Sequence, residues 1–151
     1  MTKFAANTTV SAAASRAEIE RTLEKYGASS FMYASEDEKA MIGFRINGRM
    51  IRYVVNLPSK TDLEFVRHSR GERDPDVAFK LWEQACRQKW RALNLVIKAK
   101  LEAIDAGIST IEDEFLANTV LSDGTTFGDW ARPQIDTVYL TGSMPPRLML
   151  T

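Results

Sequence analysis

Residues 74–107 read DPDVAFKLWEQACRQKWRALNLVIKAKLEAIDAG, and the other predicted elements are organised around this segment. Asp74 is suited to cap a helix, Pro75 fits the first turn, and no Gly or Pro follows before Gly107. The spacing therefore predicts one helix from Asp74 to about Ala106, roughly 48 Å long at about 1.5 Å per residue. Such a helix is longer than most helices in a chain of 151 residues.

Apolar side chains recur along one face of this helix, and basic side chains form a ridge about a quarter turn away. The apolar face is expected to lie in the core, and its members are Phe79, Trp82, Cys86, Trp90, Leu93, Ile97, Leu101 and Ile104. The basic ridge consists of Lys80, Arg87, Arg91 and Lys98. This ridge either follows a phosphate backbone or is an ordinary solvated helix face.

A hairpin is predicted upstream of the helix, because Asn47-Gly48 separates two alternating segments and suits a type I′ turn. The turn sets the register, with Ile46 opposite Arg49 and Phe44 opposite Ile51. The core face of the hairpin is predicted to carry Ile42, Phe44, Ile51, Tyr53 and Val55. The other face carries Met41, Arg45, Met50, Arg52 and Val54. We expect this second face to be partly solvated or to meet a partner.

The segments before and after the hairpin complete the predicted layout. A helix is expected at residues 15–26, where Ser15 and Glu18 form a capping box, and a strand at residues 29–34. Residues 59–73 are rich in charge and are predicted to form a surface loop.

After the long helix, Ser109 and Glu112 suggest a second capping box and a short helix. Asp123-Gly124 is a predicted turn, and a final helical segment interrupted at Pro133 ends at Gly142.

Together these elements predict an α+β fold: a helix, a three-stranded antiparallel sheet, the long helix, and a C-terminal helical extension. The expected divisions are a flexible N-terminus at residues 1–14, one domain at 15–142, and an apolar tail at 143–151. Three strands are too short to cover the whole long helix. Its distal half is therefore expected to be buried by residues 109–142, by a second copy of the chain, or by both. A homodimer would use the long helix or the tail.

Charge is unevenly distributed although the net charge is zero. Residues 39–100 hold fourteen Lys and Arg against six Asp and Glu, which gives +8, whereas residues 101–151 give −6. A segment of +8 suits a polyanion, unless the acidic C-terminal part folds back and neutralises it. The single cysteine, Cys86, cannot form an intramolecular disulfide, and no apolar run is long enough to span a membrane. We therefore expect a cytoplasmic protein.

Catalytic signals are weak. The sequence has no glycine-rich phosphate loop, no paired Cys or His spacing and no nucleophile motif, so we expect no enzymatic activity, no metal and no cofactor. The single histidine, His68, lies among loop arginines, and Cys86 lies on the apolar face of the helix.

The order of elements across residues 15–106 resembles the double-stranded RNA-binding domain and the related core of phage single-strand annealing proteins. The lysine cluster that begins the second helix in the RNA-binding family is absent, because the sequence there is Asp74-Pro75-Asp76. The stretches 39–55 and 82–93, continuing to Phe115-Leu116, resemble a family of small phage and prophage proteins without an assigned activity. That resemblance implies a phage or mobile-element setting, and hence the cytoplasm of a host cell.

Two functions are predicted from these features. The first is a non-enzymatic accessory protein that binds DNA or RNA through a basic surface. Its phosphate contacts would be Arg45, Arg52, Arg67, Arg70, Arg73, Lys80, Arg87, Arg91 and Lys98. The alternative is a protein-binding inhibitor or adaptor that acts on a host nucleic-acid enzyme or defence factor, with the acidic C-terminal part and the apolar tail as its contact surface.

Overall fold

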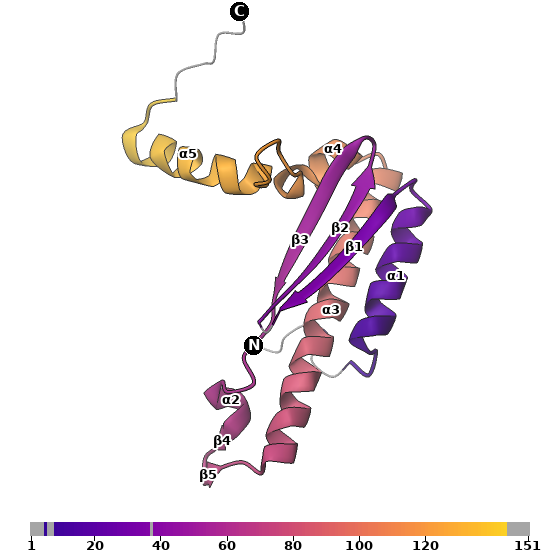
Figure 1. Ribbon diagram of the computed structural model, residues 1–151. Coiled ribbons are helices and arrows are strands. Elements are labelled where there is room, and N and C mark those ends of the chain that lie inside the picture. Colours follow the sequence, from indigo (N-terminus) through magenta and orange to yellow (C-terminus); the bar gives the residue numbers. More distant parts are fainter. Residues whose placement is uncertain (1–4, 6–7, 37, 145–151) are drawn as a thin grey trace, which may run out of the picture.

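A computed structural model describes residues 5, 8–36 and 38–144 and confirms the α+β class (Figure 1). Three strands form an antiparallel sheet in the order β1-β2-β3, and the remaining elements are mainly helical. The elements are α1 (Ala12–Glu24), β1 (Ser29–Glu36), β2 (Lys39–Ile46), β3 (Arg49–Asn56), α2 (Leu63–Val66), β4 (Arg67–His68), β5 (Gly71–Glu72), α3 (Pro75–Asp105), α4 (Ile111–Glu114), the 3-10 helix η1 (Leu116–Asn118) and α5 (Phe127–Thr141).

The hairpin between β2 and β3 has the predicted turn and register. Asn47 and Gly48 have φ angles of 49° and 74°, as a type I′ turn requires. Phe44 pairs with Ile51 and Ile42 pairs with Tyr53, so the predicted core face is confirmed. The other residues of that face are buried, whereas Tyr53 is half-buried.

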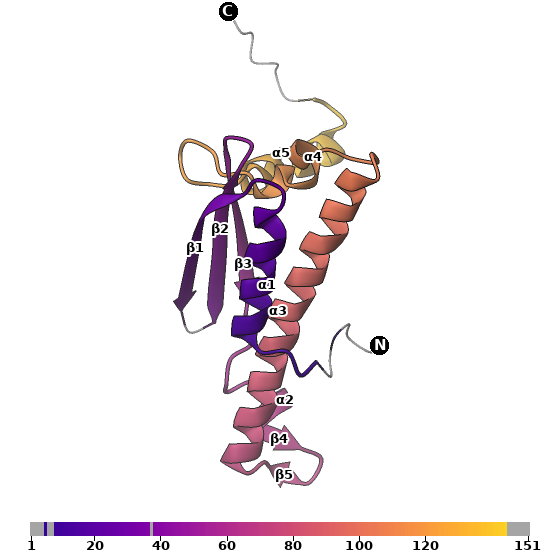
Figure 2. The ribbon, with the colours of Figure 1, turned by 90° about the vertical axis from the view of Figure 1, so that its right-hand side faces the viewer.

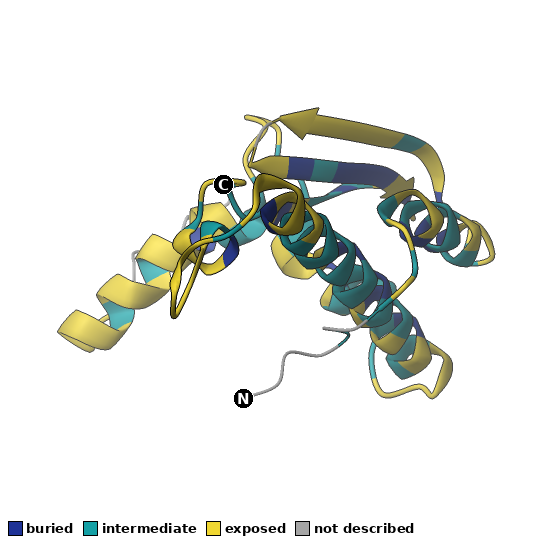
Figure 3. Cartoon of the chain, turned by 90° about the horizontal axis from the view of Figure 1, so that it is seen from below, coloured by how far each residue is buried: buried dark blue, intermediate teal, exposed yellow. Residues whose placement is uncertain are grey.

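Helices α1 and α3 cover one face of the sheet, and no described element covers the other (Figures 2 and 3). The core lies between these two layers. Its fully buried apolar side chains come from α1, the sheet, α3 and the residue after α4, and they include Ile19, Leu23, Ile42, Phe44, Ile51, Ile97, Leu101 and Phe115. Phe115 contacts Phe44 edge to face, with ring centroids 5.7 Å apart.

The long helix α3 has the predicted start, because the Asp74 side chain accepts a hydrogen bond from the backbone N–H of Asp76. Its 31 residues span about 46 Å, whereas the 8 residues of β3 span about 26 Å. The N-terminal part of α3 therefore extends beyond the sheet (Figure 1). For this reason the predicted core stripe is wrong at Phe79, which is 47% exposed, while Trp90 and Leu101 are buried as expected.

The prediction of a simple loop at residues 59–73 is wrong. This segment forms α2 and the β4–β5 hairpin, which lie beside the projecting part of α3. Phe65 is the anchor, since it is only 5% exposed. Burial of this one aromatic side chain against α3 fixes the position of the segment. The charged composition of the segment gave no indication of this.

Two predicted helix caps are displaced. The Ser11 hydroxyl, rather than Ser15, accepts from the backbone N–H of Ala14, so α1 begins at Ala12 and includes part of the predicted flexible N-terminus. Ser15 is instead fully buried. Similarly, Thr110 caps α4. Each true cap lies next to or near a second hydroxyl residue, so the residue types alone were ambiguous.

The C-terminal region first extends the sheet and then leaves it. The backbone N–H of Val120 donates to the Met50 carbonyl at 2.8 Å, which places this segment along the edge of β3. Helix α5 then continues through Pro133, so the predicted interruption is wrong. The proline lies at an exposed position, where the carbonyl left without a helical partner can bind water. The helix ends at Gly142, as predicted. Residues 145–151 of the predicted tail lie outside the described residues.

The turn between β2 and β3 requires a positive φ at Gly48, and a substitution there tests it. Replacing it with Ala should lower the free energy of unfolding by about 1 kcal/mol, because an L-residue with a Cβ is strained at positive φ. Gly48→Asn should cost less than half as much, because Asn tolerates this conformation. Urea denaturation of both variants measures the difference, and equal stabilities for Gly48→Ala and the unchanged protein would contradict the turn.

Candidate interaction surfaces

The predicted phosphate-binding residues are distributed over three parts of the molecule. Arg45 and Arg52 lie on the uncovered face of the sheet. Four others belong to the projecting end of the molecule, on the β4–β5 hairpin, next to it or on the first turns of α3: Arg67, Arg70, Arg73 and Lys80. The remaining three, Arg87, Arg91 and Lys98, lie along the middle of α3. The fold thus separates the set that the sequence analysis joined.

A single carboxylate on α1 engages two of these cations. Glu18 accepts hydrogen bonds from Arg91 Nη1 at 2.5 Å, from Asn94 Nδ2 at 2.6 Å, and from Lys98 Nζ. The side chains of Glu18 and Arg91 are only 28% and 23% exposed. The hydrogen bond from Lys98, followed by that from Arg91, lowers the pKa of Glu18 below its ordinary value. Arg91 and Lys98 therefore contribute to the α1–α3 interface rather than to an outward basic ridge.

The other cations differ in their surroundings. Arg87 donates through Nε to Gln84 Oε1 at 3.1 Å, and Arg73 Nε donates to the Arg67 carbonyl at 3.0 Å. Within the described part of the chain, five members of the predicted set have side chains without an ion-pair or hydrogen-bond partner: Arg45, Arg52, Arg67, Arg70 and Lys80. These five remain available for an external anion.

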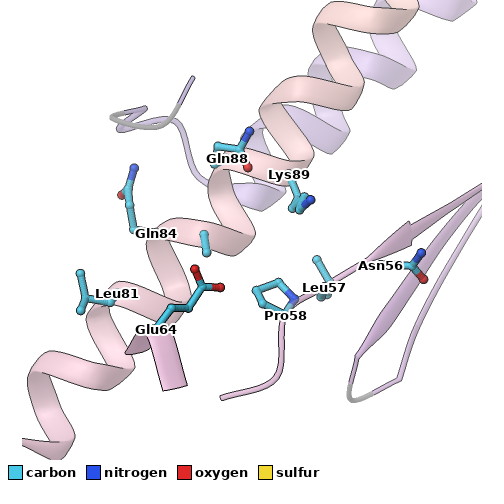
Figure 4. A pocket seen from close by; sticks show the side chains of 9 residues that line it. Asn56, Leu57, Pro58, Glu64, Leu81, Gln84, Gln88 and Lys89 are labelled. Atoms are coloured by element: carbon cyan, nitrogen blue, oxygen red, sulfur yellow. The ribbon is translucent and has the colours of Figure 1, made fainter. Parts of the chain in front are cut away.

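One groove lies where α3 passes α2 and the segment after β3 (Figure 4). Its volume is about 440 Å³, and its walls combine apolar groups with polar ones. The lining residues are Asn56, Leu57, Pro58, Glu64, Leu81, Gln84, Ala85, Gln88 and Lys89. Glu64 is the only carboxylate among them, and none is a histidine, cysteine or serine, so these walls provide no acid–base pair of carboxylates and no nucleophile with a base.

A second groove of about 630 Å³ contains Cys86 between Trp82 and Trp90. Lys60 Nζ lies 4.6 Å from the centre of the Trp82 ring. Burial, and after it the neighbouring charge of Glu83, raises the pKa of the Cys86 thiol. Because its pKa is raised, the Cys86 thiol stays protonated at neutral pH, and no histidine is among the described residues that line this groove.

Exposed apolar side chains gather on α5 and just beyond its end. The described part of α5 contacts the rest of the molecule mainly at η1, and Ala131 is its only buried residue. Tyr139 and Leu140 are each 87% exposed. Trp130, Ile135 and Met144 are also exposed. The sequence predicts a helix at Trp130, Ile135, Tyr139 and Leu140, but nothing in their spacing indicates that this helix leaves the body.

The uncovered face of the sheet is the second apolar surface. Met32, Met41, Met50 and Val54 lie on it, and Gly43 occupies its centre. A Cβ at Gly43 would lie 3.4 Å from Met32 Cε and 3.9 Å from Met50 Sδ. The methionine side chains thus close over the glycine and form a nearly continuous apolar surface. Arg45 and Arg52 flank it, as the register predicted.

Comparison with protein-family models, curated proteins and solved structures found no match to this chain. Among the described residues, no group of His, Cys, Asp and Glu side chains is arranged to hold a metal ion. None of the helices in the described ranges is long and apolar enough to cross a membrane. The features of the described residues that bear on function are therefore the two apolar surfaces and the unpaired cations.

The Glu18 contacts generate a prediction with a defined pH dependence. Glu18→Gln should lower the free energy of unfolding at pH 7 by about 2 kcal/mol, between the values for exposed and buried ion pairs. Because the folded-state pKa of Glu18 is lowered from 4.5, its stabilisation is present above that pH and disappears as the pH falls through the folded-state value. Urea denaturation should therefore show that the difference in free energy of unfolding between the unchanged protein and Glu18→Gln disappears in acid.

Glu24→Gln is the matched control, because Glu24 is exposed on the same helix. It should change the free energy of unfolding by less than about 0.5 kcal/mol, which is the range for surface substitutions. Equal effects of the Glu18 and Glu24 variants at pH 7 would show that the Glu18 contacts do not stabilise the α1–α3 interface.

Proposed function

We propose that this chain is a non-enzymatic protein-binding module whose contact element is α5. The observation that carries the proposal is the exposure of Tyr139 and Leu140 on a helix that extends from the body. Monomeric soluble proteins seldom leave a group of large apolar side chains in water, and such patches often mark interaction sites. Aromatic side chains such as Trp130 and Tyr139 are also enriched among residues that dominate binding energy.

This proposal corresponds to the alternative raised by the sequence, an adaptor or inhibitor that uses the C-terminal part. The resemblance to phage and prophage proteins supports a host nucleic-acid enzyme or defence factor as the partner class, and the host cytoplasm as the location. Asp113 adds negative charge beside α5, whereas its neighbour Glu114 is paired with Lys100 at 3.4 Å. A partner surface that combines apolar and basic groups would suit this region best.

A photo-crosslinking amino acid at Tyr139 tests the proposal in the cells in which the protein acts. We expect a discrete crosslinked protein, which is then purified so that its affinity can be measured directly. Leu140→Asp should weaken that affinity at least tenfold, because it would place a charge in an apolar contact, and tenfold corresponds to about 1.4 kcal/mol.

Thr137→Asp provides a matched control, because it introduces the same charge on α5 at an exposed polar position. It should change the affinity much less than Leu140→Asp. An affinity that is equal for the unchanged protein and Leu140→Asp would contradict α5 as the contact element.

Nucleic-acid binding is a second candidate, and its support is the set of cations at the projecting end. Arg67 and Arg70 are exposed on the β4–β5 hairpin, which stands clear of the sheet (Figure 1). A projecting hairpin with arginines can enter a groove or follow a phosphate backbone. Acidic residues of the same region, among them Glu72 and Asp76, limit the attraction. The candidate therefore concerns this small cluster rather than a continuous basic surface.

Fluorescence anisotropy with labelled single-stranded and double-stranded oligonucleotides tests this candidate. Binding through the hairpin should weaken steadily as salt rises, and Arg67→Ala/Arg70→Ala should reduce the salt slope by about 1 to 2, since each lost phosphate contact removes about one released counterion. Arg21→Ala on α1 is the control. Affinity that is independent of salt, or equal in the double variant, would contradict a role of the hairpin.

A further inference from the structure

Two uncovered apolar surfaces of this chain carry opposite charge. The face of the sheet that includes Met41 and Met50 also bears three cations against one carboxylate: Lys39, Arg45, Arg52 and Glu36. Methionine side chains adapt to varied partner shapes, which suits such a surface to a helix. The sheet face is therefore basic, apolar and adaptable.

The side of α5 that points away from the body has the complementary composition. At 100° per residue, one side of the helix carries Asp129, Arg132, Asp136, Tyr139 and Leu140. The opposite side carries Phe127, Ala131 and Val138, which are buried or half-buried. Asp129 is within 3.4 Å of Arg132, whereas Asp136 has no ion-pair partner in the described ranges. With two carboxylates against Arg132, this outer side of α5 has a net charge of −1, and it also carries the exposed Tyr139 and Leu140.

Within one chain these two surfaces do not meet. The sheet face looks away from the helices, whereas α5 extends on the side of α1 and α3 (Figures 2 and 3). The start of α5 is tied to the sheet edge, because the backbone N–H of Phe127 donates to the Thr119 carbonyl at 2.8 Å and Val120 is bonded to Met50. With its start attached in this way, α5 lies away from the sheet face of its own chain.

The dimensions of the two surfaces also agree. The 15 residues of α5 span about 22 Å, and the 8-residue strands span about 26 Å. From charge, apolar composition and length, we propose that α5 of one copy packs on the uncovered sheet face of a second copy. This inference rests on the proposed role of α5 as a protein-binding element and identifies its partner as the same chain. If the exchange is reciprocal, it closes into a two-fold dimer.

Sedimentation equilibrium tests the proposal with the full chain and two charge-reversed variants. The unchanged protein should exceed its monomer mass of 17.0 kDa. Arg45→Glu/Arg52→Glu makes the sheet face negative, so that both surfaces then carry negative charge. Asp136→Lys instead removes negative charge from α5 and so reduces the charge difference between the two surfaces. Each variant alone should associate at least tenfold more weakly. An equal mixture of the two should recover association, because the acidic helix of one meets the basic sheet of the other.

Arg21→Glu/Lys25→Glu on α1 is the matched control, since it makes the same change of net charge at exposed positions away from both surfaces. It should leave self-association unchanged, whereas Leu140→Asp should reduce it. Circular dichroism confirms that each variant is folded. An unchanged protein that remains at its monomer mass up to millimolar concentration overturns the inference, as does a mixture that fails to recover association.

The two proposals fail separately. If the chain is monomeric while Leu140→Asp still weakens binding to another crosslinked protein, the self-association is wrong and the role of α5 stands. If neither self-association nor another protein depends on Leu140, both proposals fail.

Discussion

The arrangement of α1 and α3 depends on the hydrogen bonds that the Glu18 carboxylate accepts. This carboxylate lies between α1 and α3 and accepts hydrogen bonds from Arg91, Asn94 and Lys98. Asn94 is fully buried, and its Oδ1 has no hydrogen-bond partner among the described residues. A polar group in such a position is costly unless it is bonded, so the Glu18 contact to its amide nitrogen is a strong geometric constraint. It holds α1 in one register along α3.

This constraint changes what the charges of the chain can do. The +8 of residues 39–100 suggested a polyanion surface, with neutralisation expected from the C-terminal third. The carboxylate that engages Arg91 and Lys98 comes from α1, in an interface between helices, whereas the C-terminal third supplies Glu114, which lies 3.4 Å from Lys100. Of the other predicted phosphate contacts, Arg87 lies on the middle of α3, and the rest are divided between the sheet face and the projecting end of the molecule. The uncovered apolar surfaces consequently become the more informative features for function.

Several elements could be predicted because their signals are local. Asn47-Gly48 determines a two-residue hairpin and its register through backbone geometry alone. Asp74-Pro75 starts α3, and Gly142 ends α5 with a positive φ. The helix caps at Ser11 and Thr110 were missed because neighbouring hydroxyl residues give equivalent local signals. Phe79 was wrongly placed in the core because helical periodicity does not reveal where the covering sheet ends.

Local patterns in the amino-acid sequence are enough to predict the α+β class, the hairpin register and the length of α3, and they identify the basic residues. Those properties follow from backbone preferences and spacing within a few residues. The folded arrangement is needed to show that Arg91 and Lys98 face Glu18, that Arg45 and Arg67 lie on different elements, and that α5 leaves Tyr139 exposed. These outcomes depend on which helix covers which face and where the cover ends, and that is set by packing between segments distant in the chain.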